Sequence, residues 1–443
     1  SWVAIWWVTE ALQVEVTALL PIVLFPLTGG LELTETCAAY GHKFIFLFIG
    51  GFVLAIAIEK WNLHKRIALL IINAVGTKLS HIVLGFMLST AFMSMWISNT
   101  ATTIMMLPIG MAIIKQMTYG KNAKQFGKAL MLSIAYSASI GGMATLIGTP
   151  PNLVLAGILE TTMNIELTFS KWFMFGFPIT LVLLLICWKY LTSFAFNLKT
   201  QNLEGGKAII KTQLKSLGKM GFEEKLVLAV FVFTALLWIF RSALLKAIIP
   251  AIDDTIIAIF AALLLFILPS SKKGEKLIEW KEAVKLPWGI LLLFGGGIAI
   301  AVAFDKSGLA LWIAENLSSL GSLHLFLLLL VLVACVNFLT EITSNLATVS
   351  VLLPVLAPLA LAINVHPLAL MVACTVAASC AFMLPVATAP NAIVFGSGYI
   401  TINDMMKAGF WLNLISILIL TLAIYFLLPL LWEIDLGVYS ISW

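Results

Sequence analysis

Two blocks of this chain are near copies of each other. Phe92–Pro108 (FMSMWISNTATTIMMLP) superimposes without a gap on Phe338–Pro354 (FLTEITSNLATVSVLLP), and the two share Phe, Ser-Asn, Ala-Thr and Leu-Pro. At the same offset, Leu47–Leu63 superimposes on Leu293–Leu309, with two glycines and an acidic residue followed by lysine in common. Each copy places a polar Ser-Asn pair inside an apolar segment. In a membrane protein, matched polar breaks in two halves of the chain are the best sequence pointer to a transporter's binding site.

The composition indicates a membrane protein. Hydrophobic residues make up 61% of the sequence and charged residues only 11%, whereas a soluble domain carries roughly 25% charged residues. Apolar runs long enough to span about 30 Å of hydrocarbon recur along the whole chain. The net charge of +5 arises in lysine-rich loops, which indicate membrane orientation rather than nucleic-acid binding. The chain starts at Ser1 and Trp2–Val8 is already apolar, so we expect a further N-terminal piece with at least one helix.

The lysine-rich loops predict which segments face the cytoplasm. The positive-inside rule places four clusters there: Glu59–Arg66, Lys115–Lys128, Asn197–Lys225 and Ser270–Lys285. The first two flank one apolar region, Ile82–Ile114, which must therefore enter and leave on the same side as a re-entrant hairpin with Ser98–Thr100 at its tip. An odd number of crossings separates the two copies, so the second hairpin, Leu325–Ile363, is expected to enter from outside. The repeat is thus predicted to be inverted in topology.

Two further crossings are interrupted by proline. Leu130–Leu159 is expected to break at Gly148–Asn152 (GTPPN), and Leu368–Val394 at the corresponding Ala387–Asn391 (ATAPN). Proline ends one helix and suits the first turn of the next, and Ser, Thr and Asn favour helix starts. Hairpin tips and breaks together would present helix N-termini near the bilayer midplane, which suits an anion. The oxygens freed at the same breaks could hold a small hard cation.

The acidic residues near the spans allow different roles. Glu341 lies beside the second hairpin tip, where its counterpart is Met95. An intramembrane carboxylate is a functional candidate by default, so Glu341 could bind a cation or a proton, or it could pair structurally. Asp253-Asp254 is expected to be solvated at an outer span end. Gly295-Gly296-Gly297 is expected to allow close helix packing, because no strand precedes it and no Gly-Lys-Ser/Thr follows, as a phosphate loop requires.

Several motifs resemble one membrane family. SNTATT with GTPPN, TEITSN with ATAPNAIVFGSG, and WNLHKRIAL are similar to the divalent anion/sodium symporter family over essentially the whole chain. Its members carry dicarboxylates, citrate or sulfate. The resemblance implies an all-α polytopic membrane protein with eleven transmembrane helices, two re-entrant hairpins and two broken helices, in which this chain begins inside the second family helix. It also implies a homodimer in the plasma or inner membrane, an elevator motion, sodium at two or more sites, and neither an organic cofactor nor a nucleic-acid partner.

The resemblance also divides the chain into scaffold and transport elements. Residues 1–80 would form N-terminal scaffold helices, and 196–321 a linker with the scaffold helices of the second copy. Residues 81–195 and 322–400 would form the transport elements, and 401–443 the C-terminal helix.

By position, the resemblance implies a substrate site between two sodium sites. One sodium would use Ser94, Ser98, Asn99 and Gly148. The other would use Thr340, Ser344, Asn345 and Ala387. Substrate carboxylates would meet residues from all four breaks, namely Ser98, Asn99, Thr100, Thr149, Pro150, Ser344, Asn345, Leu346 and Thr388. The chain departs from the pattern at Leu346, where many relatives have Thr, and at Ala389, whose counterpart is Pro150; the first departure leaves the substrate open.

The leading functional hypothesis is secondary active symport of sodium with a di- or tricarboxylate of the succinate, malate or citrate class. A dicarboxylate exchanger on the same fold, or a symporter of divalent anions such as sulfate, fits the same motifs. A passive anion channel is the alternative from another class, although matched hairpins favour alternating access. An enzyme is not expected, because no Ser/His pair, aspartate pair or HExxH motif occurs within the predicted spans.

Overall fold

The computed structural model describes residues 2–9, 11–76, 78–115, 121–198, 206–272, 274–316 and 323–437. Parts of three predicted cytoplasmic loops, at 116–120, 199–205 and 273, lie outside these ranges. Within them the regular secondary structure is helical and no strand is formed, although an isolated bridge joins Pro269 and Lys276. The prediction of an all-α protein is therefore confirmed for the described part of the chain.

Among the described residues, six helical stretches are long and apolar enough to cross a membrane: Leu33–Lys60, Phe169–Ala195, Phe222–Ile248, Trp288–Lys306, Asn345–Ala362 and Ile402–Trp432. Shorter apolar helices accompany them, including the arms of the hairpins. The total number of transmembrane helices stays a prediction, because the broken and paired helices are too short to be assigned by length alone.

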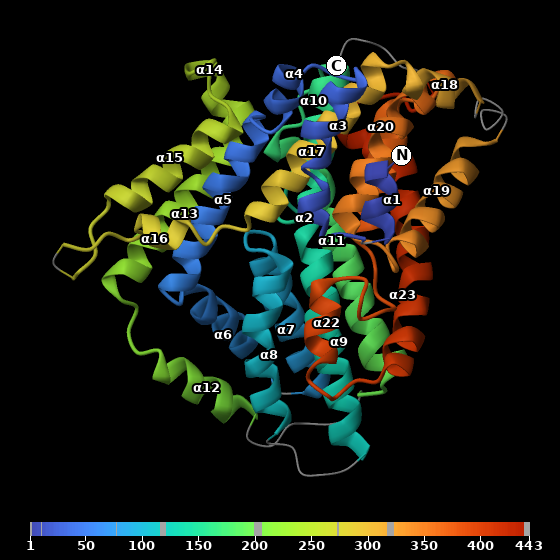
Figure 1. The fold of residues 1–443 in the computed structure, drawn as a ribbon. Helices are drawn as coiled ribbons and strands as arrows, with labels where there is room; N and C mark the ends of the chain where they lie inside the picture. Colours follow the sequence, from blue (N-terminus) through green and yellow to red (C-terminus); the bar gives the residue numbers. More distant parts are fainter. Residues whose placement is uncertain are drawn as a thin grey trace.

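The two copies of the repeat form the same succession of helices. The first copy contains α5 (Lys43–Lys60), α6 (Leu63–Val75), α7 (Leu79–Ser94), α8 (Asn99–Ile114), α9 (Lys121–Gly142) and α10 (Pro150–Met163). The second contains α17 (Trp288–Lys306), α18 (Leu309–Asn316), α19 (Leu325–Leu339), α20 (Asn345–Ala362), α21 (Pro367–Ala378) and α22 (Ala389–Phe395). Both predicted helix–turn–helix hairpins are present, as α7–α8 and α19–α20. Figure 1 shows the first hairpin below the centre of the molecule and the second above it.

The remaining helices precede, connect and follow the copies. The chain begins with α1 (Trp2–Thr9), α2 (Val14–Thr17), α3 (Leu20–Thr28) and α4 (Leu33–Ala39). The connection contains α11 (Phe169–Lys189), the π-helical turn η1 (Tyr190–Ala195), α12 (Gly206–Ser216), α13 (Phe222–Phe240), the π-helical turn η2 (Arg241–Leu245), α14 (Lys246–Ile248), α15 (Asp254–Ile267) and α16 (Trp280–Ala283). The chain ends with α23 (Ile402–Leu422), the π-helical turn η4 (Ala423–Leu427) and α24 (Leu428–Trp432).

Paired glycines let α5 and α17 approach their neighbours closely. A Cβ atom on Gly50 of α5 would lie 2.5 Å from the backbone of Ala258 in α15. At the corresponding position of α17, a Cβ atom on Gly296 would lie 2.8 Å from the carbonyl oxygen of Ala18. Any side chain would push these helices apart, so the glycine run of α17 is a packing feature, as the sequence predicted.

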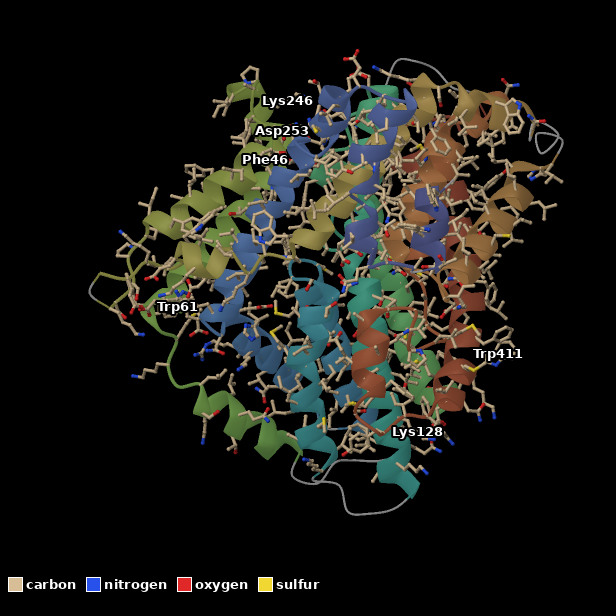
Figure 2. All side chains as sticks on the ribbon, in the orientation of Figure 1. Phe46, Trp61, Lys128, Lys246, Asp253 and Trp411 are labelled. Atoms are coloured by element: carbon tan, nitrogen blue, oxygen red, sulfur yellow. The ribbon has the colours of Figure 1, made fainter. Side chains whose placement is uncertain are left out.

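Ion pairs join several helices at the predicted outer end of the bundle. Here the expectation that Asp254 is solvated was wrong. Asp254 is buried rather than solvated: its carboxylate pairs with Arg241 at 3.0 Å and accepts the backbone N–H of Phe169 at 2.8 Å. Asp253 pairs instead with Lys43 at 3.2 Å. Figure 2 labels Asp253 at this end of the molecule, beside α5 and α15. Asp254 is buried because Arg241, on the adjoining π-helical turn, supplies the compensating charge that a buried carboxylate requires.

Candidate functional site

The breaks of the two copies meet around one cavity of about 330 Å³. Residues of both hairpin tips and of both broken helices line it. Every residue predicted to bind substrate is among them: Ser98, Asn99, Thr100, Thr149, Pro150, Ser344, Asn345, Leu346 and Thr388. The cavity is of the size that holds a small organic ligand. Segments far apart in the sequence are thus brought to one place, as the repeat predicted.

An oxygen cluster lies behind the first hairpin tip. The hydroxyl oxygen of Ser94 is 2.6 Å from Oδ1 of Asn99 and 2.7 Å from the carbonyl oxygen of Ala138. A hydroxyl carries one hydrogen, so it can satisfy only one of these acceptors at a time. Three oxygens that share one hydrogen form an electron-rich cluster. Such a donor set fits a hard cation such as sodium, and contains no group with a competing positive charge.

The second tip repeats this cluster. The hydroxyl oxygen of Thr340 is 2.7 Å from Oδ1 of Asn345 and 3.1 Å from the carbonyl oxygen of Ala378. Thr340 and Asn345 superimpose on Ser94 and Asn99 in the repeat. The remaining residues of the predicted sodium sites line the adjacent cavity: Ser98, Gly148, Ser344 and Ala387. Each predicted set therefore consists of one buried hydroxyl, on Ser94 or Thr340, and three residues that line the cavity.

The helices that start at the cavity differ in whether a side chain accepts a hydrogen bond from the backbone N–H groups of their first turn. Ser98 is the N-cap of α8, and its hydroxyl accepts the N–H of Ala101 at 3.2 Å. Thr388 caps α22 in the same way, with the N–H of Asn391 at 3.3 Å. The side chains of Thr149 and Ser344, which precede α10 and α20, make no such bond. The hydroxyls of Thr149 and Ser344 are therefore not engaged as caps and can contact a ligand in the cavity.

Both helix breaks begin earlier than the proline motifs predicted. The helix α9 ends at Gly142 and α21 ends at Ala378, so the non-helical segments are 143–149 and 379–388. The prolines of both motifs already belong to the following helices. The prediction placed the breaks at 148–152 and 387–391 because it read proline as the cause of the break, whereas proline here only begins the next helix.

Two asparagines hold these segments in their irregular conformation. The side-chain amide of Asn152 donates to the carbonyl oxygens of Thr145 at 2.8 Å and Gly142 at 3.3 Å. The amide of Asn391 donates to the carbonyl oxygens of Leu384 at 3.0 Å and Ala381 at 3.1 Å. Sequence reasoning missed this role, although the Asn that ends both five-residue motifs was its signal.

Glu341 supports the second broken helix. Only 3% of the residue is exposed, and its carboxylate accepts the backbone N–H groups of Phe382, Met383 and Leu384 at 2.7, 2.9 and 3.1 Å. Asn413 of α23 donates a further hydrogen bond at 2.7 Å. These donors occupy both carboxylate oxygens, so of the two roles left open by the sequence the geometry favours structural pairing. Asn413 gave no sequence signal.

The lining residues that come from outside the hairpins and broken helices have a different character. They lie on α2, α5 and α17, which contribute the apolar side chains of Val14, Phe48, Phe52, Ile290 and Leu293. Glu15 of α2 is the exception among them. The hairpins and broken helices contribute every Ser, Thr and Asn of the lining, together with apolar residues such as Ile147 and Val386. We call their side the polar face, and the side of α2, α5 and α17 the apolar face.

The chain is similar to known sodium-dependent transporters along almost its whole length. A sequence profile described as the sodium:sulfate symporter transmembrane region matches residues 2–433. Over 445 residues the chain is 47% identical to the sodium-dependent dicarboxylate transporter SdcS of Staphylococcus saprophyticus, covering 98% of this chain and 86% of the relative. Over 447 residues it is 48% identical to SdcS of Staphylococcus aureus strain USA300, with the same coverage.

Solved structures share the fold at low sequence identity. The YdaH transporter of Alcanivorax borkumensis has a TM-score of 0.54 at 11% identity, over 90% of this chain and 88% of that chain. MtrF of Neisseria gonorrhoeae has a TM-score of 0.53 at 13% identity, over 88% of this chain and 83% of that chain. At these identities the likeness concerns the fold alone.

Proposed function

The chain belongs to the sodium:sulfate symporter family, as its motifs predicted, and we propose that it is a secondary active transporter that couples sodium to a dicarboxylate. It is a multi-pass protein of the plasma membrane. The relatives that are nearly half identical over almost the whole chain are named sodium-dependent dicarboxylate transporters. That degree of identity supports the same substrates here.

The observation that carries the proposal is one cavity flanked by two equivalent oxygen clusters. Helix N-termini and unengaged hydroxyls at the cavity suit the carboxylates of an anion. The clusters at Ser94–Asn99 and Thr340–Asn345 lie directly behind the tips that line it. Sodium bound there would fix the tips and offset the substrate's negative charge. This arrangement supports symport, because cation and anion would be bound by the same two short segments.

We propose an elevator motion for the transport step. The hairpins and broken helices (81–195 and 322–400) would move together with the substrate, while α2, α5 and α17 would remain in the scaffold. The apolar face of the cavity supports this division, because an apolar surface lets the polar face slide past without losing hydrogen bonds. The opposite placement of the two hairpins in Figure 1 fits an inverted repeat. The homodimer implied by the family resemblance is part of the same proposal.

Reconstituted protein tests symport against exchange. In proteoliposomes that contain no carboxylate, an inward sodium gradient should drive accumulation of labelled succinate. Uptake that requires internal carboxylate and ignores the sodium gradient would indicate the exchanger instead. Flux that does not saturate, and shows no counterflow, would indicate a channel.

Sodium and the anion should raise each other's affinity by the same factor. Because both would bind the hairpin tips, thermodynamic linkage makes this factor reciprocal. Coupling of this kind is typically about 5- to 150-fold. Titration of succinate at several sodium concentrations, and of sodium at several succinate concentrations, measures it through thermal stabilisation of the purified protein. Potassium is the matched control ion. Succinate affinity that is independent of sodium would contradict the proposal.

Replacing Leu346 with threonine should change the ranking among carboxylates and leave sodium dependence intact. Leu346 lines the cavity where its counterpart Thr100 offers a hydroxyl. A hydrogen bond to a charged group is worth roughly 1.5–3 kcal/mol, or about ten- to hundredfold in affinity. Competition of succinate, citrate and α-ketoglutarate against one labelled substrate gives the ranking. Lower thermal stability with an unchanged ranking would show that Leu346 only packs the hairpin.

A further inference from the structure

The apolar face of the cavity carries one carboxylate. Glu15 lies on the short helix α2, among the apolar side chains that α2, α5 and α17 present to the cavity. Of the described residues that line the cavity, Glu15 is the only one with an ionisable side chain. The polar face has no ionisable side chain among these residues. A carboxylate repels anions, so its presence in a cavity proposed to bind an anion requires an explanation.

Glu15 has no partner that would neutralise it. Within the described part of the chain, its carboxylate takes part in no ion pair and no hydrogen bond. The deeply buried carboxylates behave differently: Glu341 is enclosed by N–H donors and Asp254 is paired with Arg241. A half-buried charge without a partner exerts its field on whatever occupies the adjoining space, since low-dielectric walls screen it weakly.

The Glu15 side chain lies against the first turn of α17. A Cβ atom on Gly289, in the first turn of α17, would lie 2.2 Å from Cγ and 3.0 Å from Oε1 of Glu15. The side chain therefore lies directly across this glycine, and a larger residue at position 289 would displace it. Packing of α2 on α17 thus places the carboxylate beside this turn, at the apolar face of the cavity.

We propose that Glu15 selects substrates by their charge, so that the cavity accepts a dianion and disfavours a trianion. The inference rests on the proposed function and specifies its substrate class as small dicarboxylates. Two carboxylates of one substrate can both contact the polar face. A third carboxylate would extend toward the apolar face and meet Glu15. Electrostatic repulsion grows with the charge of the substrate, so the penalty is larger for a trianion, which is specificity by repulsion.

The Glu15→Gln variant tests this, because it keeps the shape of the side chain and removes its charge. Full-length protein in proteoliposomes takes up labelled succinate at about pH 8, well above the pKa values of carboxylic acids. Unlabelled succinate and citrate compete. Competition by citrate should strengthen about tenfold in the variant, and competition by succinate about threefold or less. Thermal stabilisation of the purified variant by each anion gives the same comparison without transport.

Matched variants separate this effect from a general loss of charge. Glu15→Asp keeps the charge and should keep the wild-type ratio of citrate to succinate affinity. Glu35→Gln removes a carboxylate outside the cavity, where Glu35 pairs with Lys306 at 2.5 Å, and should leave the ratio unchanged. An unchanged ratio in Glu15→Gln would overturn the inference. A weakened sodium response without a change in ratio would overturn it as well, by assigning Glu15 to the cation. If wild-type protein neither takes up nor binds succinate with sodium, the proposed function fails instead.

Discussion

Alanine at Asn99 or at Asn345 should abolish sodium-driven uptake of carboxylate. Each side chain contributes the oxygen that lies 2.6 or 2.7 Å from a hydroxyl in the oxygen cluster of its hairpin. Removal leaves two oxygens of the cluster, and loss of one interaction with a charged group costs roughly 1.5–3 kcal/mol, or about ten- to hundredfold in affinity. Because sodium would act at both tips, loss at either should prevent coupling. Uptake of labelled succinate per molecule of reconstituted protein is the measurement.

The variants should remain folded. Ser98 and Ser344 occupy the N-cap positions of α8 and α20, so the asparagines are the first helical residues and their loss removes no cap. Asn316→Ala, at an exposed position of α18, is the matched control and should transport at the wild-type rate. If Asn99→Ala or Asn345→Ala showed near wild-type uptake at equal abundance in the membrane, the assignment of the cation sites would be wrong.

The sequence predicted which residues come together at the cavity better than it predicted the contacts that support them. Polar residues inside apolar segments are rare and costly, so Ser98-Asn99 and Ser344-Asn345 were conspicuous in the sequence. Their duplication then indicated that the two pairs would meet. The first residues of α10 and α22 were recognised by the same logic, because proline favours helix starts.

What could not be predicted depends on contacts between distant residues. The breaks begin at 143 and 379 because Asn152, Asn391 and Glu341 bind the backbone of these segments. Ala378 carries no local signal of a helix end, and Gly141-Gly142 is ambiguous, because the similar pair Gly50-Gly51 lies inside α5. The burial of Asp254 likewise depends on Arg241, which is far enough along the chain that no local pattern joins them. The ends of these helices and the burial of Asp254 thus depend on tertiary hydrogen bonds and ion pairs.

Glu341→Ala should destabilise the protein more than other single changes at the site. It would leave the N–H groups of Phe382, Met383 and Leu384 and the amide of Asn413 without their acceptor. Each buried donor that is left without an acceptor costs about 1–3 kcal/mol. We expect a clear fall in the thermal unfolding midpoint of the detergent-solubilised protein and low abundance in the membrane. The segment 379–388 should lose its shape first, because the carboxylate is what holds it.

Two milder variants separate this structural role from ion binding. Glu341→Gln keeps one acceptor oxygen, so it should lose less stability than Glu341→Ala and retain sodium-dependent uptake. Asn413→Ala removes one donor and leaves three backbone N–H groups on the carboxylate, at a cost of about 1–3 kcal/mol. If Glu341→Gln unfolded at the wild-type temperature but no longer responded to sodium or to pH, Glu341 would be an ion-binding residue. Every donor around Glu341 is already directed at its carboxylate. We therefore expect stability to decrease in the order wild type, Asn413→Ala, Glu341→Gln, Glu341→Ala, and the first three proteins to keep their sodium dependence.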